Sequence, residues 1–198
     1  MSMSLTSGLR WLHAAALFVF VAALCLAVAV LAIAFIPGSP VSQDLPEAAL
    51  SGLHRAGGVV AGVVPDPSGW SPFQIEDPSP AQRLLHMLTE VPGLVLVAEI
   101  GRRMARLVRG AQDGDPFTTE SAEALATLGK LTAFAGLGTW MLSQVGQGLL
   151  CTTMLSSSFT FRPQATPLAW LAVGLIFAAF GRILGRGVAM RAELDTLI

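Results

Sequence analysis

The stretch from Ala14 to Ile36 contains no charged residue and is apolar almost throughout. A helix of this length, at about 1.5 Å per residue, is longer than the hydrocarbon layer of a bilayer, about 30 Å. Further apolar stretches follow, so the sequence predicts an all-α integral membrane protein. We expect a four-transmembrane-helix bundle with spans at about 11–36, 84–108, 125–154 and 167–189.

Composition agrees with this assignment, because 53% of the 198 residues are hydrophobic and only 13% are charged. The net charge of −1 argues against direct nucleic-acid binding, which needs a basic face. Few residues remain outside the spans, so residues 1–198 are expected to form a single membrane domain. A cleaved signal peptide is the lesser interpretation of the first span, because the apolar run exceeds the usual length and only Arg10 precedes it.

The Lys and Arg residues are distributed unequally around the spans. Nine fall on the side that holds both termini and the loop between the second and third spans, and three fall on the other side, which accounts for all 12. The bias predicts that both termini are cytoplasmic. Residues 37–79 then form a small extracytoplasmic loop module.

This loop contains a candidate β-hairpin. A β-branched run from Val59 to Val64 is followed by the turn string PDPSG and then by the segment from Trp70 to Ile75. A third candidate strand, Ser157 to Phe161, lies in the loop after the third span. The sequence therefore predicts a short extracytoplasmic hairpin that a third strand could join.

Two helix starts carry capping signals. Ser79 precedes Pro80, and Gln82 stands three residues after Ser79, which is a capping-box pattern. Asp115-Pro116 is expected to end the preceding helix, and Thr118 to cap the third span.

Glu99 precedes Arg102 and Arg103 by three and four residues, the favourable order for ion pairs along a helix. We therefore interpret Glu99 as structural.

Four polar residues are expected at similar depth in the second and third spans if these spans are antiparallel neighbours: His86, Glu90, Gln144 and Gln147. Ionisable groups inside a bilayer usually face the protein interior, so the cluster could be a proton or cation site in the outer half of the bundle. The more ordinary interpretation is hydrogen bonding between helices. A single His and Glu pair has too few ligands for a metal site, and no cofactor is expected.

The chain has two cysteines, Cys25 and Cys151, and we interpret both as packing residues. Near its end, Gly181 and Gly185 form a GxxxG pattern that allows close helix contact within the bundle or between protomers, so a homo-oligomer is also possible.

The second span continues as a basic helix in which Arg102, Arg106 and Arg109 share one face. One interpretation is that they contact the anionic headgroups of membrane lipids. The other is that they form a docking surface for an acidic cytoplasmic partner.

Two segments resemble a known family, and they read RRMARLVRGAQDGDPFTTESAEALATLG and FGRILGRGVAMRAELDTLI. Both are similar to segments of domain-of-unknown-function family 2975, which are bacterial multi-span membrane proteins. The chain departs from the family pattern at Ser121, where Asn is common. The resemblance implies the bacterial cytoplasmic (inner) membrane and no established activity. It also implies a small helix-turn-helix transcription regulator as a possible partner, because genes for such regulators often lie beside those of the family.

No nucleophile, base and orienting group occur at a recognisable spacing, so we expect no enzyme and no catalytic residues. The sequence favours a regulatory or interaction protein that binds a partner, such as the regulator or another membrane protein, at its cytoplasmic face. A small proton- or cation-linked permease is the alternative. The candidate interaction surface consists of Arg102, Arg106, Arg109, Asp115, Phe117, Thr118, Arg191 and Asp195.

Overall fold

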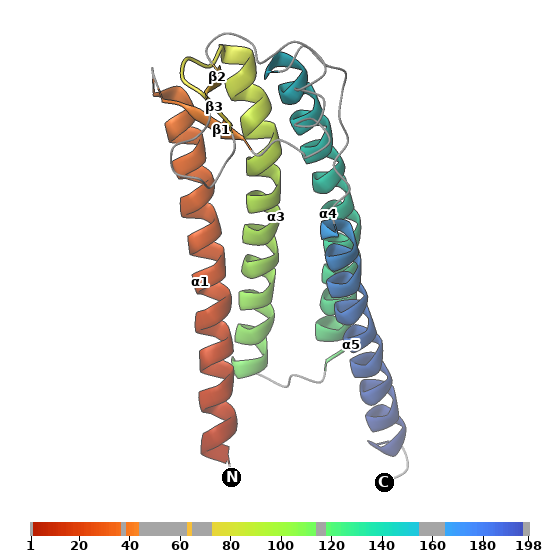
Figure 1. Cartoon of the computed structure of the whole chain (residues 1–198). Coiled ribbons are helices and arrows are strands. Elements are labelled where there is room, and N and C mark those ends of the chain that lie inside the picture. The colour runs from red at the N-terminus through yellow and green to blue at the C-terminus, as the bar shows by residue number, and fades with distance from the viewer. Residues whose placement is uncertain are drawn as a thin grey trace. The chain divides into compact units, whose positions relative to one another are not determined.

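A computed structural model describes residues 2–36, 39–43, 63–64, 73–113, 118–154 and 165–195. Four long α-helices make up most of these residues (Figure 1). They are α1 (Ser2–Phe35), α3 (Pro80–Asp113), α4 (Thr119–Met154) and α5 (Thr166–Asp195). The predicted helical fold is confirmed, and every helix extends beyond the apolar run that predicted it.

Three of the helices are long and apolar enough to cross a membrane, which supports a membrane protein. The qualifying segments are Gly8–Phe35, Pro80–Gln112 and Thr166–Leu194. Helix α4 is the longest of the described helices at 36 residues but is not among these three. Its sequence includes Lys130, Gln144 and Gln147, which lower its apolar character.

The chain packs as two compact units, which divide α1, α3 and α4 between them, while α5 lies wholly in the first. The first unit comprises Met1–Cys25, Leu94–Thr139 and Ala165–Ile198. The second comprises Leu26–Gly93 and Trp140–Gln164. The expectation of a single membrane domain stays a prediction.

In the first unit, α4 and α5 pack antiparallel along a seam of small residues. A Cβ placed on Gly129 would lie 2.6 Å from both the Ala178 nitrogen and the Gly174 oxygen. A Cβ on Gly181 would lie 2.7 Å from the Ala126 nitrogen. Only glycine permits such close backbone approach, which is how membrane helices commonly associate. Gly181 of the GxxxG pattern is therefore used inside this unit.

The first unit also holds a close contact between α1 and α3. The His13 ring donates from Nδ1 to the Ala105 carbonyl oxygen over 3.1 Å. A Cβ on Gly101 would lie 3.0 Å from the Phe20 nitrogen and 3.1 Å from the Ala16 oxygen. The two helices are thus antiparallel neighbours at these positions.

The second unit contains a small antiparallel sheet with the order β1-β3-β2. Its strands are β1 (Val41–Gln43), β2 (Val63–Val64) and β3 (Phe73–Ile75). Val63 and Val41 both pair with Ile75, from opposite sides of β3. Strands β2 and β3 lie within the two segments predicted for the hairpin, whereas β1 was not predicted. Ser157 to Phe161 lies outside the described residues.

The C-terminal end of α1 is capped by side chains within the second unit. The Arg83 guanidinium donates from Nη1 to the Ile36 and Ala34 carbonyl oxygens over 2.7 and 3.0 Å, and from Nε to the Pro78 oxygen over 3.2 Å. The Ser39 hydroxyl donates to the Ile36 oxygen over 2.9 Å. These bonds satisfy carbonyls that have no partner inside the helix.

The start of α3 matches the predicted capping box. The Ser79 N–H donates to Gln82 Oε1 over 2.8 Å, and the Gln82 N–H donates to Ser79 Oγ over 3.3 Å. Gln82 also donates from Nε2 to Thr153 Oγ1 over 3.2 Å. Further along, a Cβ on Gly146 would lie 2.9 Å from Thr89 Cγ2. These contacts confirm that α3 and α4 are antiparallel neighbours in the second unit.

Candidate functional site

A groove in the first unit lies between the last turns of α3 and the first turns of α4. Its volume is about 700 Å³. Arginine side chains stand on the α3 wall, and glutamate and hydroxyl side chains stand on the α4 wall. The lining residues are Arg103, Arg106, Leu107, Gly110, Thr118, Glu120, Ser121, Glu123, Ala124 and Thr127.

The α4 wall is positioned by the cap that the sequence predicts. The Ser121 N–H donates to Thr118 Oγ1 over 3.1 Å, and the Thr118 hydroxyl donates to Ser121 Oγ over 2.8 Å. Helix α4 begins at Thr119, so Thr118 is its N-cap. Glu120 lies in the first turn, where the positive end of the helix dipole favours a carboxylate.

One arginine of the α3 wall forms an ion pair, and another has no described ion pair. Arg103 donates from Nε to Glu99 Oε1 over 2.7 Å, and Arg102 also pairs with Glu99 at 2.7 Å. The predicted structural role of Glu99 is thereby confirmed. Arg106 is exposed, and within the described chain it pairs with neither Glu120 nor Glu123. The groove therefore presents positive and negative groups on opposite walls that do not neutralise each other directly.

The structure brings together two members of the candidate interaction surface, Arg106 and Thr118, which both line the groove. The remaining described members are exposed but stand outside its described lining: Arg102, Arg109 and Arg191. Asp195 is the last residue of α5, and its side chain lies outside the described part. Asp115 and Phe117 also lie outside the described residues.

The sequence interpretation missed the acidic wall of the groove. Glu120, Glu123 and Thr127 follow each other at the spacing of one helix face, as do Arg103, Arg106 and Gly110 on α3. The available signal was a stripe of arginines before residues 114–117 and a stripe of glutamates after them. The sequence alone does not show that the two stripes face each other.

The intramembrane polar cluster is only partly assembled in the second unit. His86 lies on the face of α3 that also carries Gln82 and Thr89, which contact α4. It is half-buried, and its Nδ1 is buried without a described hydrogen-bond partner. Glu90 is exposed and Gln147 is half-buried.

Gln144 does not join His86 at the contact between α3 and α4. It precedes Gly146 by two residues, which turns it roughly 160° around α4 from the side that meets Thr89. Gln144 is only 4% exposed, and its Nε2 has no described hydrogen-bond partner. The described contacts do not join the four residues, and their grouping into one site stays a prediction.

No three His, Cys, Asp or Glu side chains within the described ranges gather as metal ligands would. Cys25 is exposed and Cys151 is buried, and both thiols are free. Burial of Cys151 at 3% exposure fits the packing role expected for it.

Comparison with known proteins gives no relative. No family model matches the chain, and neither a curated protein nor a solved structure resembles it significantly.

Proposed function

We propose that this chain is a non-enzymatic protein of the bacterial inner membrane that binds a protein partner at its cytoplasmic face. The groove between α3 and α4 is the observation that carries the proposal. Its walls hold Arg106 on one side and Glu120 and Glu123 on the other, without a direct ion pair between them. Side chains of both signs at the rim of a hollow favour a folded protein, whose surface offers both signs, over a small apolar ligand.

The proposed topology has four spans with both termini in the cytoplasm. Support for α4 as a span comes from its seam with α5, because the apolar part of α5 contacts α4 along its length in the first unit. A Cβ on Gly136 would lie 2.6 Å from the Trp170 side chain, and one on Gly174 would lie 2.7 Å from Ala133 Cβ. A helix that packs this closely against a membrane span is itself expected to lie in the membrane. Small seam residues also explain why α4 has modest hydropathy.

Reporter fusions test this topology. Fusions after Ser39 and after Thr153 are expected to read extracytoplasmic, and fusions after Asp113 and at the C-terminus are expected to read cytoplasmic. Equal cytoplasmic signals after Asp113 and after Thr153 would show that α4 does not cross and would refute the four-span topology.

The proposed partner is a cytoplasmic protein with basic and acidic groups side by side. A small helix-turn-helix regulator, the class implied by the family resemblance, fits this description. Binding to the membrane would remove such a regulator from its DNA. The groove lies beside the end of α3 at Asp113 and the start of α4 at Thr119, which the four-span topology puts at the cytoplasmic side, so a soluble protein can reach it.

Site-specific photo-crosslinking in cells tests the partner directly. A photoreactive residue is placed at Arg106, at Glu123 and, as a matched control on α4, at Lys130, which is exposed and outside the groove. We expect one and the same protein to crosslink from both walls and not from Lys130. Crosslinking that is equal at all three positions, or absent from the groove, refutes the proposal.

A proton- or cation-linked permease remains the second candidate. It is favoured by the buried Nδ1 of His86 and the buried Nε2 of Gln144, which have no described partners. Polar atoms left unsatisfied inside a membrane bundle are costly, and transport pathways are where they occur. Flux assays in proteoliposomes, with His86→Phe as the inactive comparison, decide the matter. No flux of protons, Na⁺ or K⁺ through the unmodified protein eliminates this candidate.

A further inference from the structure

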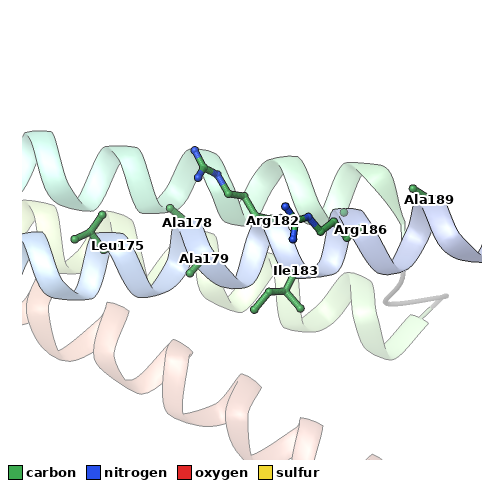
Figure 2. A pocket seen from close by; sticks show the side chains of 8 residues that line it. Leu175, Ala178, Ala179, Arg182, Ile183, Arg186 and Ala189 are labelled. Carbon is green, nitrogen blue, oxygen red and sulfur yellow. The ribbon is translucent and has the colours of Figure 1, made fainter.

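A second hollow lies on α5, in the first unit, away from the groove between α3 and α4. Its volume is about 880 Å³. Its lining combines small side chains, two aliphatic side chains and two arginines that lie between Leu175 and Ala189 (Figure 2). The lining residues are Leu175, Ala178, Ala179, Arg182, Ile183, Gly185, Arg186 and Ala189.

The two arginines are open to a ligand. Arg182 and Arg186 stand four residues apart, so they are neighbours on one side of the helix. Both are exposed, and no ion pair joins either of them to another described residue. Figure 2 shows both side chains extending toward the Leu175 end of the hollow. The positive charges therefore lie toward the apolar part of the hollow.

Their expected depth in the membrane favours an anionic ligand. From Pro167 to Gly181 helix α5 carries no charge and rises about 21 Å, which is less than the hydrocarbon thickness of about 30 Å. Arg182 therefore enters the membrane near its inner edge. An unpaired guanidinium at that depth is unfavourable, and Arg binds phosphate oxygens through paired N–H groups.

We propose that this hollow is a binding site for an anionic phospholipid, with the lipid phosphate between Arg182 and Arg186. One acyl chain lies along Ala178, Ala179 and Leu175, where the small residues leave room for it. The combination of two arginines and apolar side chains matches a lipid, because a free phosphate would gain nothing from the apolar side chains. The inference rests on the placement of α5 in the membrane and not on the partner groove.

Native mass spectrometry of the full chain in detergent tests the site. Phosphatidylglycerol and phosphatidylcholine of the same acyl chains are titrated separately. We expect tighter binding of phosphatidylglycerol, and a loss of about 25-fold in its affinity in the double variant Arg182→Gln/Arg186→Gln, at about fivefold for each arginine. The double variant Arg10→Gln/Lys130→Gln removes the same net charge at exposed positions elsewhere and should bind as the original does.

A second variant separates the lipid from other ligands. Ala179 is exposed, so Ala179→Leu fills the hollow without changing charge and should weaken phosphatidylglycerol binding. Soluble glycerol phosphate should not compete. The proposal is overturned if phosphatidylcholine binds equally well, if the Arg182/Arg186 double variant keeps its affinity, or if glycerol phosphate displaces the lipid. Crosslinking from Arg106 is expected to persist in every case.

Discussion

Substitution of Gly129 by alanine should separate α4 from α5. The added Cβ would lie 2.6 Å from the Ala178 nitrogen and from the Gly174 oxygen, whereas ordinary contacts begin at 3.4 Å. Both neighbours are backbone atoms, which cannot rotate away. The helices must therefore move apart by about 0.8 Å, the difference between the two distances.

The free-energy change follows from the contacts that this movement weakens. A gap of this size removes about a quarter to a half of each atomic contact of about 0.1–0.2 kcal/mol. Over roughly forty atom pairs along the seam the loss is about 2 kcal/mol, within the range of about 1–3 kcal/mol typical of overpacking. Alanine also favours the helix over glycine by about 1 kcal/mol, so the net destabilisation of Gly129→Ala is about 1 kcal/mol.

Gly138→Ala is the matched control, because it lies on the same helix and no atom lies within 4 Å of the added Cβ. The helix-propensity term is common to both variants and cancels in their difference. Unfolding by sodium dodecyl sulfate in mixed micelles, followed by circular dichroism, should show Gly129→Ala to be less stable than Gly138→Ala by about 2 kcal/mol. If the two variants are equally stable, or if Gly129→Ala is the more stable, the seam is not packed as described.

Three further outcomes are expected. Arg83→Gln should lower the free energy of unfolding by about 2 kcal/mol, because carbonyls at the end of α1 lose a charged donor; unchanged hydrogen exchange there would contradict this. Thr118→Ala should cost about 1 kcal/mol in the same unfolding assay and Thr118→Asn much less, since only alanine lacks a capping oxygen. With a lipid-soluble maleimide, intact mass should show Cys25 reacting before Cys151, and the reverse order would contradict the burial of Cys151.

The sequence predicts the features that depend on residues close together in the chain. Ser79 and Gln82, Thr118, and Glu99 with its two arginines all act within one helical turn, and the structure confirms each. The sequence underestimates the length of the helices. An apolar run marks only the part of a helix that lies in the hydrocarbon, and the hydrogen-bonded helix continues beyond it into polar residues.

Features that need a distant partner escape prediction. Arg83 donates to the Ile36 carbonyl although the two residues are 47 positions apart in the sequence, and no local sequence pattern predicts that contact. The polar cluster stays a prediction for a related reason. The depth of Gln144 follows from counting residues, but the side of α4 that meets α3 is decided by Gly146 and its contact with Thr89. The acidic wall of the groove likewise required knowing that the two charged stripes face each other.

The small-residue seam between α4 and α5 also determines which substitutions natural selection can accept. Positions such as Gly129, Gly174 and Gly181 accept a larger side chain only if the two helices move apart, because backbone of the neighbouring helix occupies the space. Exposed positions such as Phe134 and Ile176 can exchange among Leu, Ile, Val and Phe without a change in packing. Among relatives, invariance along the seam will therefore record helix contact. Invariance at Arg106, Glu123, Arg182 or Arg186, where nothing in the packing demands one residue, will instead record selection for binding.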